Sequence, residues 1–286
     1  MNNKYLATLE IKKDELQELN LFLGRLSIEE YYEYEYDLFL KKTNNSNLAF
    51  VSFYPSELKV LEREIIELKN KIKREGNLLE NIEGKIKELA KKYSDNLKAK
   101  IDNRMEEMKE DDKSHYLIYQ VLGISDNEGH LIDLYQNKGR FLYKYAGSFL
   151  EEATKLCFLE KFPNSATTKI PNTLGKRPKT FEIDCLEGNN AIEIKWRDAT
   201  TDGDHITKEH TRIKVIHQAG YQPIRVMFYY PNRTQAMKIQ NTLETLYKGI
   251  GGEYYYGDSA WEYVKDRTTI DLKEILEKIA KENSGD

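Results

Sequence analysis

Cysteine is scarce in this sequence, whose 286 residues include only Cys157 and Cys185. Two thiols cannot build a disulfide framework, and no Cys-x-x-Cys pair or closely spaced Cys/His set supports a structural zinc site. The chain also lacks an apolar leader and any run of 18 apolar residues that could span a bilayer. We therefore expect a cytoplasmic protein with two reduced, buried thiols and no membrane partner.

Nucleotide-binding motifs and a strong net charge are also absent. Without a Walker motif or the glycine loop of a methyltransferase, the chain should use no nucleotide cofactor, which excludes ATP-driven motors and methylases. The net charge is only −4, but the charge is unevenly distributed. Residues 161–248 carry 14 Lys/Arg against 9 Asp/Glu, whereas residues 251–286 carry 5 against 9. An anionic partner is therefore expected to bind the central segment.

Residues 1–112 are predicted to form a mainly helical N-terminal region. Short Glu- and Tyr-rich helices are expected up to about residue 45, and residues 47–54 alternate as in a strand. From about residue 56 to 110, apolar residues recur at spacings of three and four, which defines a heptad seam: Leu58, Leu61, Ile65, Leu68, Ile72, Leu79, Ile82, Ile86, Leu89 and Tyr93. The preserved phase favours one helix of roughly 80 Å, whereas Gly76-Asn77 favours a turn and a helical hairpin. Both alternatives stay open at this point.

The second predicted domain covers residues 113–286. The elements expected in it are a helix over 132–160, a basic loop over 162–179, strands over 180–184 and 191–196, a helix over 205–218, a strand over 223–230, a helix over 232–247, a Tyr/Gly-rich loop and a helix over 271–282. This order predicts an α/β fold in which helices flank a mixed β-sheet.

The hairpin of the first two strands carries the strongest chemical pattern. Asp184 ends the first strand, and Glu193-x-Lys195 follows on the second. Because side chains alternate along a strand, Glu193 and Lys195 should point to one face and Ile192, Ile194 and Trp196 to the other. Two neighbouring carboxylates offer the oxygen ligands that Mg²⁺ takes, and Mn²⁺ should substitute. We therefore expect Asp184, Glu193 and Lys195 to be catalytic, with Lys195 bonding the attacking water or a phosphate.

An acid-x-Lys pair alone is a weak signal, but its context here resembles a known class. Asp184-x8-Glu193-x-Lys195 between two strands, after a helix with Gly147-x3-Glu151, resembles the PD-(D/E)xK nuclease superfamily, although no proline immediately precedes Asp184. Residues 132–147, 181–184 and 193–210 are similar to the ApaLI-like type II restriction endonucleases. This resemblance implies a restriction-endonuclease-like fold and Mg²⁺-dependent hydrolysis of double-stranded DNA that leaves 5′-phosphate ends. It also implies a homodimer in the bacterial cytoplasm.

The helix before the strands should supply a further acid to the metal. The resemblance assigns this role to Glu151. Helical geometry favours Glu152 instead, because it lies about 100° from Ala153, the centre of the apolar face, whereas Glu151 points nearly opposite. Both residues are therefore candidate metal ligands.

Several basic or polar residues around the hairpin are expected to contact DNA. A loop that leads into a helix N-terminus suits phosphate contact, because backbone N–H groups are free there. Lysine and arginine can also read base edges or touch phosphates. The candidates are Lys176, Arg177, Lys179, Arg197, His205, Lys208 and Arg212.

Two other functions compete with a type II restriction endonuclease. A structure-specific repair or recombination nuclease would keep the same core. A coiled-coil DNA-binding protein would instead rely on the heptad segment and have no catalysis.

Overall fold

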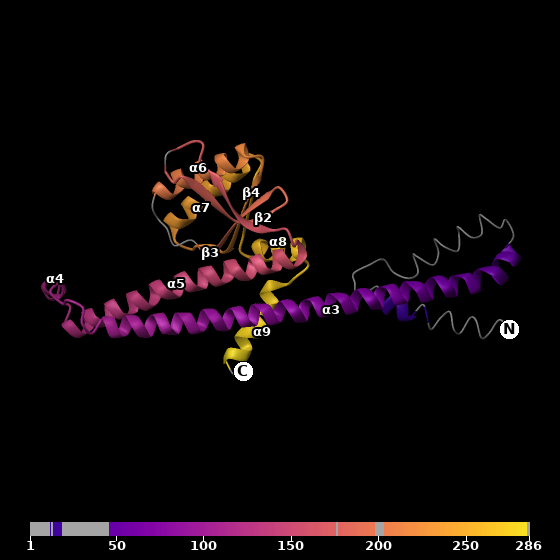
Figure 1. The fold of residues 1–286 in the computed structure, drawn as a ribbon, viewed down its shortest axis with the longest axis horizontal. Helices are drawn as coiled ribbons and strands as arrows, with labels where there is room; N and C mark the ends of the chain where they lie inside the picture. The colour runs from indigo at the N-terminus through magenta and orange to yellow at the C-terminus, as the bar shows by residue number, and fades with distance from the viewer. Residues whose placement is uncertain (1–11, 13, 19–45, 176, 198–202, 285–286) are drawn as a thin grey trace. The chain divides into compact units, whose positions relative to one another are not determined.

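The computed structural model describes residues 12, 14–18, 46–175, 177–197 and 203–284 (Figure 1). The chain forms two compact units, Met1–Asn81 and Ile82–Asp286. Helix α3 (Ser46–Glu107) contributes to both units and is helical throughout, which excludes a turn at Gly76-Asn77. The predicted short helices before residue 46 lie largely outside the described residues. A domain boundary near residue 112 stays a prediction.

The strand predicted over residues 47–54 is wrong, because these residues belong to α3. Alternation over eight residues specifies a strand only where another strand pairs with it, and none of the described strands does so. In the first unit, the heptad seam is buried at Leu61, Ile65 and Leu68. Helical packing of this seam therefore outweighs the local alternation.

The second unit contains the predicted mixed sheet. Its five strands lie in chain order: β1 (Ala166–Pro171), β2 (Thr180–Glu187), β3 (Asn190–Arg197), β4 (Gln222–Tyr229) and β5 (Glu253–Tyr256). The pairs β1–β2 and β2–β3 are antiparallel, whereas β3–β4 and β4–β5 are parallel. The helices are α4 (Tyr116–Val121), α5 (Asp126–Lys161), α6 (Gly203–Gln218), α7 (Thr234–Lys248), α8 (Asp258–Thr268) and α9 (Leu272–Ser284). The predicted α/β fold is confirmed.

Four of these elements, α4, β1, β5 and α8, were not expected from the sequence. Strand β1 replaces part of a predicted loop, and its exposed residues surround one buried apolar side chain, Ile170, so it lacks an alternating pattern. Strand β5 is only four residues long, and helix α8 follows it directly through Gly257. Short elements at the edge of a sheet depend on their neighbours more than on their own sequence pattern.

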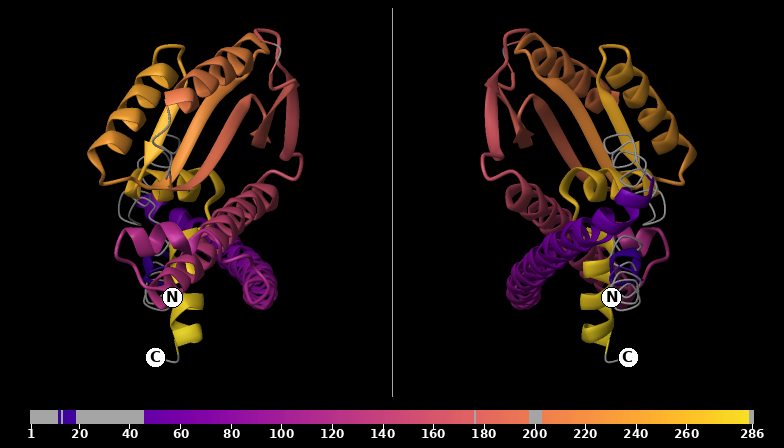
Figure 2. Two further views of the ribbon diagram at one scale, coloured as in Figure 1. Left: turned by 90° about the vertical axis from the view of Figure 1, so that its left-hand side faces the viewer. Right: turned by 90° about the vertical axis from the view of Figure 1, so that its right-hand side faces the viewer.

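Helices cover both faces of the sheet, as Figure 2 shows. On one face, α5, α8, α9 and the C-terminal part of α3 bury a large apolar cluster that includes Ile192, Ile194, Ile224 and Val226. On the other face, α6 and α7 cover two smaller clusters. We call these the α5 face and the α6 face. The two free cysteines, Cys157 and Cys185, are buried on the α5 face, as expected.

Helix α5 is positioned by its start and by its apolar side. Ser125 caps the helix: its hydroxyl accepts from the Glu128 N–H at 3.3 Å, and the Glu128 carboxylate accepts from the Ser125 N–H at 3.0 Å. Leu150, Ala153, Cys157 and Phe158 lie on one side of the helix and pack into the cluster on the α5 face. This packing leaves Glu151 and Lys155 beside the sheet rather than inside the cluster.

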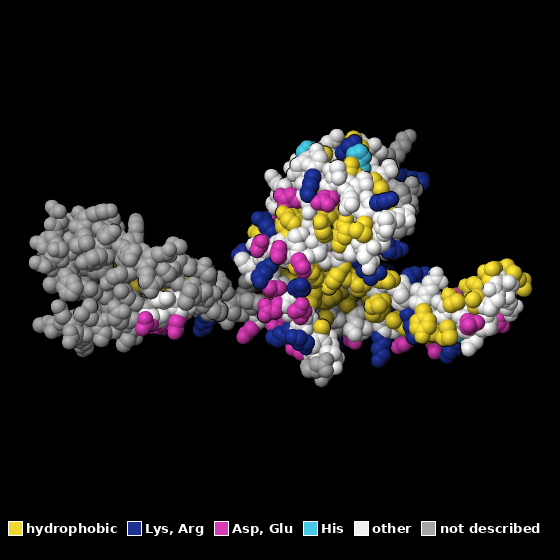
Figure 3. Space-filling model, turned by 180° about the vertical axis from the view of Figure 1, so that it is seen from behind, with side chains coloured by type: hydrophobic (Ala, Val, Ile, Leu, Met, Phe, Trp, Pro, Cys, Tyr) yellow, Lys and Arg dark blue, Asp and Glu magenta, His cyan; other side chains and the backbone are white. Residues whose placement is uncertain are grey.

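Some apolar side chains of the second unit remain exposed. Leu117, Ile118 and Val121 on α4, and Leu122 directly after it, are all more than half exposed. Apolar side chains gather at the tip formed by α4 and the start of α5 (Figure 3). These four side chains belong to none of the buried clusters of the sheet. No helix within the described ranges is both long and apolar enough to cross a membrane.

Candidate active site

A β-bulge in β2 sets the position of Asp184. The pairing of β1 with β2 passes from Thr168↔Ile183 to Ala166↔Leu186, so β2 contains one residue more than β1 over this stretch. Ile183 packs on the α6 face, whereas Cys185 packs on the α5 face, so the regular alternation is broken at Asp184. The Thr167 hydroxyl donates to the Asp184 carbonyl at 2.8 Å. Bulges re-aim side chains in this way and are frequent beside active sites.

Strands β2 and β3 separate at the same point. Their pairing runs from Glu187↔Asn190 to Cys185↔Ile192. Beyond it, the Ile194 N–H donates to the Asp184 Oδ2 atom at 2.8 Å instead of to a backbone carbonyl. The carboxylate thus satisfies a backbone donor that the diverging strand leaves unpaired. This bond holds Asp184 against β3 at the fork between the two strands.

The predicted alternation along β3 is confirmed. Ile192 and Ile194 belong to the cluster on the α5 face, and Trp196 packs against the same cluster. Glu193 and Lys195 therefore point to the α6 face. Parallel pairing places Glu193 opposite Arg225 of β4.

The structure brings the three predicted catalytic residues together. Lys195 Nζ lies 2.6 Å from Glu193 Oε1 and 3.9 Å from Asp184 Oδ2. Glu193 and Asp184 are 3% and 7% exposed, while the Lys195 side chain is 34% exposed. The ammonium therefore lies beside two buried carboxylates, on a side chain that is partly open to solvent.

The two carboxylates have opposite pKa shifts. Burial raises the pKa of Asp184 to about 7, and the charge of Glu193 adds to this rise. Burial also acts to raise the pKa of Glu193, but the charges of Lys195, Arg212 and Arg225 outweigh it and hold that pKa well below its usual range. The charges of Glu193 and Asp184 raise the pKa of Lys195 against the effect of its burial. Near neutral pH, Glu193 and Lys195 are thus both charged.

Further charged residues surround Glu193 on the α6 face. Arg212 of α6 pairs with Glu193 Oε2 and donates to the Glu182 carbonyl. Arg212 Nη1 lies 3.6 Å from Glu209 Oε1, and Arg225 Nη1 lies 3.2 Å from Glu209 Oε2. Sequence reasoning missed Glu209 and Arg225. The available signal was Arg225 itself, since an arginine inside an apolar strand needs a buried acid as partner.

The two candidates for the third acid lie on different sides of α5. Glu152 accepts from the Tyr93 hydroxyl of α3 at 2.6 Å. Glu151 Oε1 lies 2.8 Å from Lys155 Nζ, and its charge contributes to the raised pKa of Asp184. Glu152 is not among the causes of that rise. Glu151 is therefore linked electrostatically to Asp184, whereas Glu152 lines the cavity beside Asp184 and bonds Tyr93.

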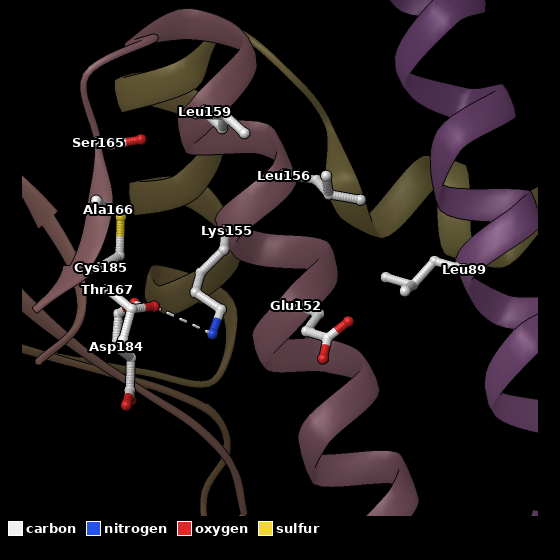
Figure 4. Close-up of a pocket in the computed structure, with 10 residues that line it drawn as sticks. All are labelled: Leu89, Glu152, Lys155, Leu156, Leu159, Ser165, Ala166, Thr167, Asp184 and Cys185. Atoms are coloured by element: carbon white, nitrogen blue, oxygen red, sulfur yellow. Dashed lines mark hydrogen bonds between the residues drawn. The ribbon is translucent and has the colours of Figure 1, made fainter. Parts of the chain in front are cut away.

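A cavity of about 290 Å³ adjoins Asp184 between α5, β1 and β2. Lys155, which the sequence analysis did not single out, extends across it toward Thr167 and Asp184, and its Nζ lies 3.5 Å from the Thr167 hydroxyl (Figure 4). Glu152 points away from Asp184, to the side of α5 that faces Leu89 (Figure 4). Lys155 thus lies between Glu151 and the bulge that carries Asp184.

The residues predicted to contact DNA fall into two groups. Arg197 is exposed and donates to the Tyr143 hydroxyl at 2.9 Å, with its guanidinium 4.5 Å from the ring centroid. Other cations are exposed at Arg177, Lys179 and Lys208, whereas Arg212 is largely buried in the charge network. Lys176 and the side chain of His205 lie outside the described part of the chain. Contact of any of these residues with DNA stays a prediction.

The acids at the fork fit a hard cation. Carboxylate oxygens are the donors that Mg²⁺ prefers, and Mg²⁺ usually binds one or two of them and keeps several waters. Asp184 and Glu193 supply two such groups. No set of three or more acidic, His or Cys side chains forms a ready metal cluster within the described residues. The donor set is thus suited to a metal that completes its coordination with water.

A mixed sheet flanked by helices, with Asp184, Glu193 and Lys195 on neighbouring strands, agrees with the PD-(D/E)xK nuclease class that the sequence resembles. A family model described as ApaLI-like restriction endonuclease matches residues 58–281, and the chain belongs to this family. Neither the curated proteins nor the solved structures include a match to the chain.

Proposed function

We propose that the protein is a type II restriction endonuclease that cuts double-stranded DNA at a specific sequence. The reaction is Mg²⁺-dependent hydrolysis of a phosphodiester bond that leaves a 5′-phosphate. The observation that carries this proposal is the position of Lys195, which lies between the buried carboxylates Asp184 and Glu193 at the strand fork. Membership of the ApaLI-like family supports the same activity.

Each residue of the fork has a role in this proposal. Asp184 and Glu193 hold Mg²⁺, with Glu151 as the third acid. When bound, Mg²⁺ supplies positive charge that screens the phosphate and favours ionisation of a nearby water. Lys195 donates through Nζ to the attacking water or to a phosphate oxygen, and its neighbours Glu193 and Asp184 keep it protonated.

The substrate calls for additional contacts and for symmetry. Arg177, Lys179, Arg197 and Lys208 are exposed cations that suit phosphate groups. Sites of type II enzymes are commonly palindromic, so two copies related by a two-fold axis could each cut one strand. We therefore propose a homodimer as the active form.

The test is to incubate the purified full-length protein with phage DNA and Mg²⁺. Discrete fragments with 5′-phosphate ends are expected, and Mn²⁺ should replace Mg²⁺. EDTA should abolish cutting, while Ca²⁺ should support binding without cutting. A smear would indicate a nuclease without site specificity, as for a repair enzyme. Intact DNA that is nevertheless bound would leave a non-catalytic DNA-binding protein.

The third acid can be tested separately with Glu151→Gln, using Glu152→Gln as the matched control on the same helix turn. Glu151→Gln should raise the Mg²⁺ concentration needed for half-maximal cleavage by about 10-fold or more, because a ligand is lost. Glu152→Gln should leave this concentration unchanged, since Glu152 bonds Tyr93 instead. The reverse result would move the third acid to Glu152.

A further inference from the structure

A chain of buried charges extends from Glu193 into the interior of the α6 face. Arg225 on β4 is fully buried, and Glu209 on α6 is 3% exposed. Arg225 Nη1 lies 3.2 Å from Glu209 Oε2, and Glu209 Oε1 lies 3.6 Å from Arg212 Nη1. Arg212 in turn pairs with Glu193 Oε2. The order Arg225–Glu209–Arg212–Glu193 alternates in sign at every step.

The fold alone gives little reason to keep these charges. Removing charged groups from water is costly, and apolar residues of similar volume in such positions often leave stability unchanged or increase it. Arg225 lies between the buried Ile224 and Val226 on a strand that is otherwise apolar or aromatic over its buried length. A buried ion chain that ends on a catalytic carboxylate therefore points to a role in the site.

The geometry shows how this row of buried charges acts on Glu193. One carboxylate oxygen, Oε1, accepts from Lys195, and the other, Oε2, accepts from Arg212. The carboxylate is thus fixed from two sides and cannot rotate freely. Each oxygen has two lone pairs, so an oxygen that accepts one hydrogen bond keeps a second position for a cation. Arg212 itself is held by Glu209, which lies one helical turn before it on α6 and is held in turn by Arg225.

We propose that Glu209 and Arg225 are positioning residues of the nuclease: they anchor Arg212, which orients the Glu193 carboxylate for the metal. Neither residue touches substrate or metal. The inference rests on the proposed function, because it assigns a metal to Glu193. Outer partners of this kind affect metal affinity or activity by about 10–100-fold when they are removed.

The experiment compares three variants with the unaltered protein. Glu209→Gln removes the central charge and leaves two arginines without it. The double variant Glu209→Met/Arg225→Met removes both buried charges together and replaces them with apolar volume, so that folding is retained even if Glu209→Gln unfolds. Glu187→Gln is the matched control. It breaks an Arg–Glu pair of 2.5 Å with Arg267 at the hairpin end of β2, where the Glu187 side chain is 12% exposed.

Two measurements separate positioning from simple stability. Mn²⁺ binding without DNA is followed by electron paramagnetic resonance, and the cleavage rate is titrated with Mg²⁺. Glu209→Gln and the double variant should both bind Mn²⁺ about 10-fold or more weakly and need correspondingly more Mg²⁺. Thermal unfolding should show that the double variant is as stable as the unaltered protein. Glu187→Gln should bind Mn²⁺ normally.

Every outcome decides the proposal. Native Mn²⁺ binding by the folded double variant would overturn it, because the anchor would then be dispensable. Failure of both Glu209 variants to fold would also overturn it, since the buried ion pairs would then serve the fold itself. If the unaltered protein binds Mn²⁺ and cuts DNA while the variants match it, this inference fails alone. If the unaltered protein does neither, the proposed function fails.

Discussion

The two faces of the sheet differ in what they bury. The α5 face buries apolar side chains together with Thr154 and Thr268, whose hydroxyls bond helix carbonyls at 2.7 and 2.6 Å. The α6 face buries apolar clusters together with a row of paired charges, Arg225, Glu209, Arg212 and Glu193, which ends at the partly exposed Lys195. Both faces are built from the same strands. One strand can therefore supply stability through one set of side chains and chemistry through the alternate set.

This division has a physical basis in β3. Ile192 and Ile194 belong to the apolar cluster, so burial of apolar area holds the strand on its α5 face. Glu193 and Lys195 lie on the other side and are held by charge. The rigid apolar side keeps the charged side in place, which suits a site whose catalytic groups need fixed positions.

The largest effect should come from the charged residues at the fork. Asp184→Ala, Glu193→Ala and Lys195→Ala should each lower the cleavage rate by at least about 10³-fold, because each removes an essential electrostatic group. Circular dichroism and DNA binding should stay close to those of the unaltered protein. Near-native cleavage by any one variant would remove that residue from the mechanism and would weaken the assignment of the chemistry to the charged side chains.

A substitution that creates a cavity in the apolar cluster on the α5 face should lower stability rather than activity. Phe158 is fully buried in α5, so Phe158→Ala should lower the free energy of unfolding by about 3–5 kcal/mol. Leu142→Ala on the same helix is the control, because Leu142 is 51% exposed and should change the value by less than about 0.5 kcal/mol. Urea unfolding measures both. If Phe158→Ala stayed folded and stable but lost cleavage, the α5 face would have a chemical role as well.

The buried acid of the fork should make stability depend on pH. Burial raises the pKa of Asp184 to about 7 from an ordinary value of 3.8, so the folded chain holds a proton that the unfolded chain has released. The metal-free protein should therefore lose stability, on the order of a few kcal/mol, as the pH rises from about 4 to about 7. Glu193, whose pKa is lowered from 4.5 to about 2, makes stability depend on pH mainly below this range.

Asp184→Asn should flatten this pH dependence, because an amide does not titrate. Urea unfolding in EDTA at pH 5 and pH 7.5 checks the prediction for both proteins. An equal change of stability with pH in the two proteins would show that ionisation of Asp184 does not destabilise the metal-free fold.

The smallest effect is an expected lack of reaction. Burial raises the pKa of Cys157 and of Cys185 to about 12, which leaves almost no thiolate at pH 8. A colorimetric disulfide reagent should therefore react slowly with the folded protein and rapidly with both thiols in urea. Fast reaction of either thiol in the folded state would show that the α5 face opens in solution.

The sequence pattern was sufficient for the parts of the site that depend on local order. Alternation in β3 predicted that Glu193 and Lys195 share a face, and the turn before β3 predicted that Asp184 lies nearby. These are properties of one hairpin. The order of elements likewise predicted a mixed sheet with flanking helices.

The rest of the site depends on contacts between distant segments. Arg212 and Lys208 lie one turn apart and were both expected to face DNA, but only Lys208 is exposed. The burial of Arg212 follows from its pairing with Glu193 and Glu209, and the latter is tied to Arg225 on β4. The separation of Glu151 from Glu152 likewise depends on Tyr93 of α3, which a helical wheel of α5 does not include.

The extra residue in β2 has a consequence in genetic terms. At this point β2 contains one residue more than its partner β1. There the Asp184 carbonyl accepts from the Thr167 hydroxyl, and the Asp184 carboxylate accepts from the Ile194 N–H. Deletion of a single codon between Ile183 and Leu186 would restore an unbroken strand while removing the kink that presents the carboxylate. An in-frame loss of one codon there should therefore be eliminated by selection for cleavage.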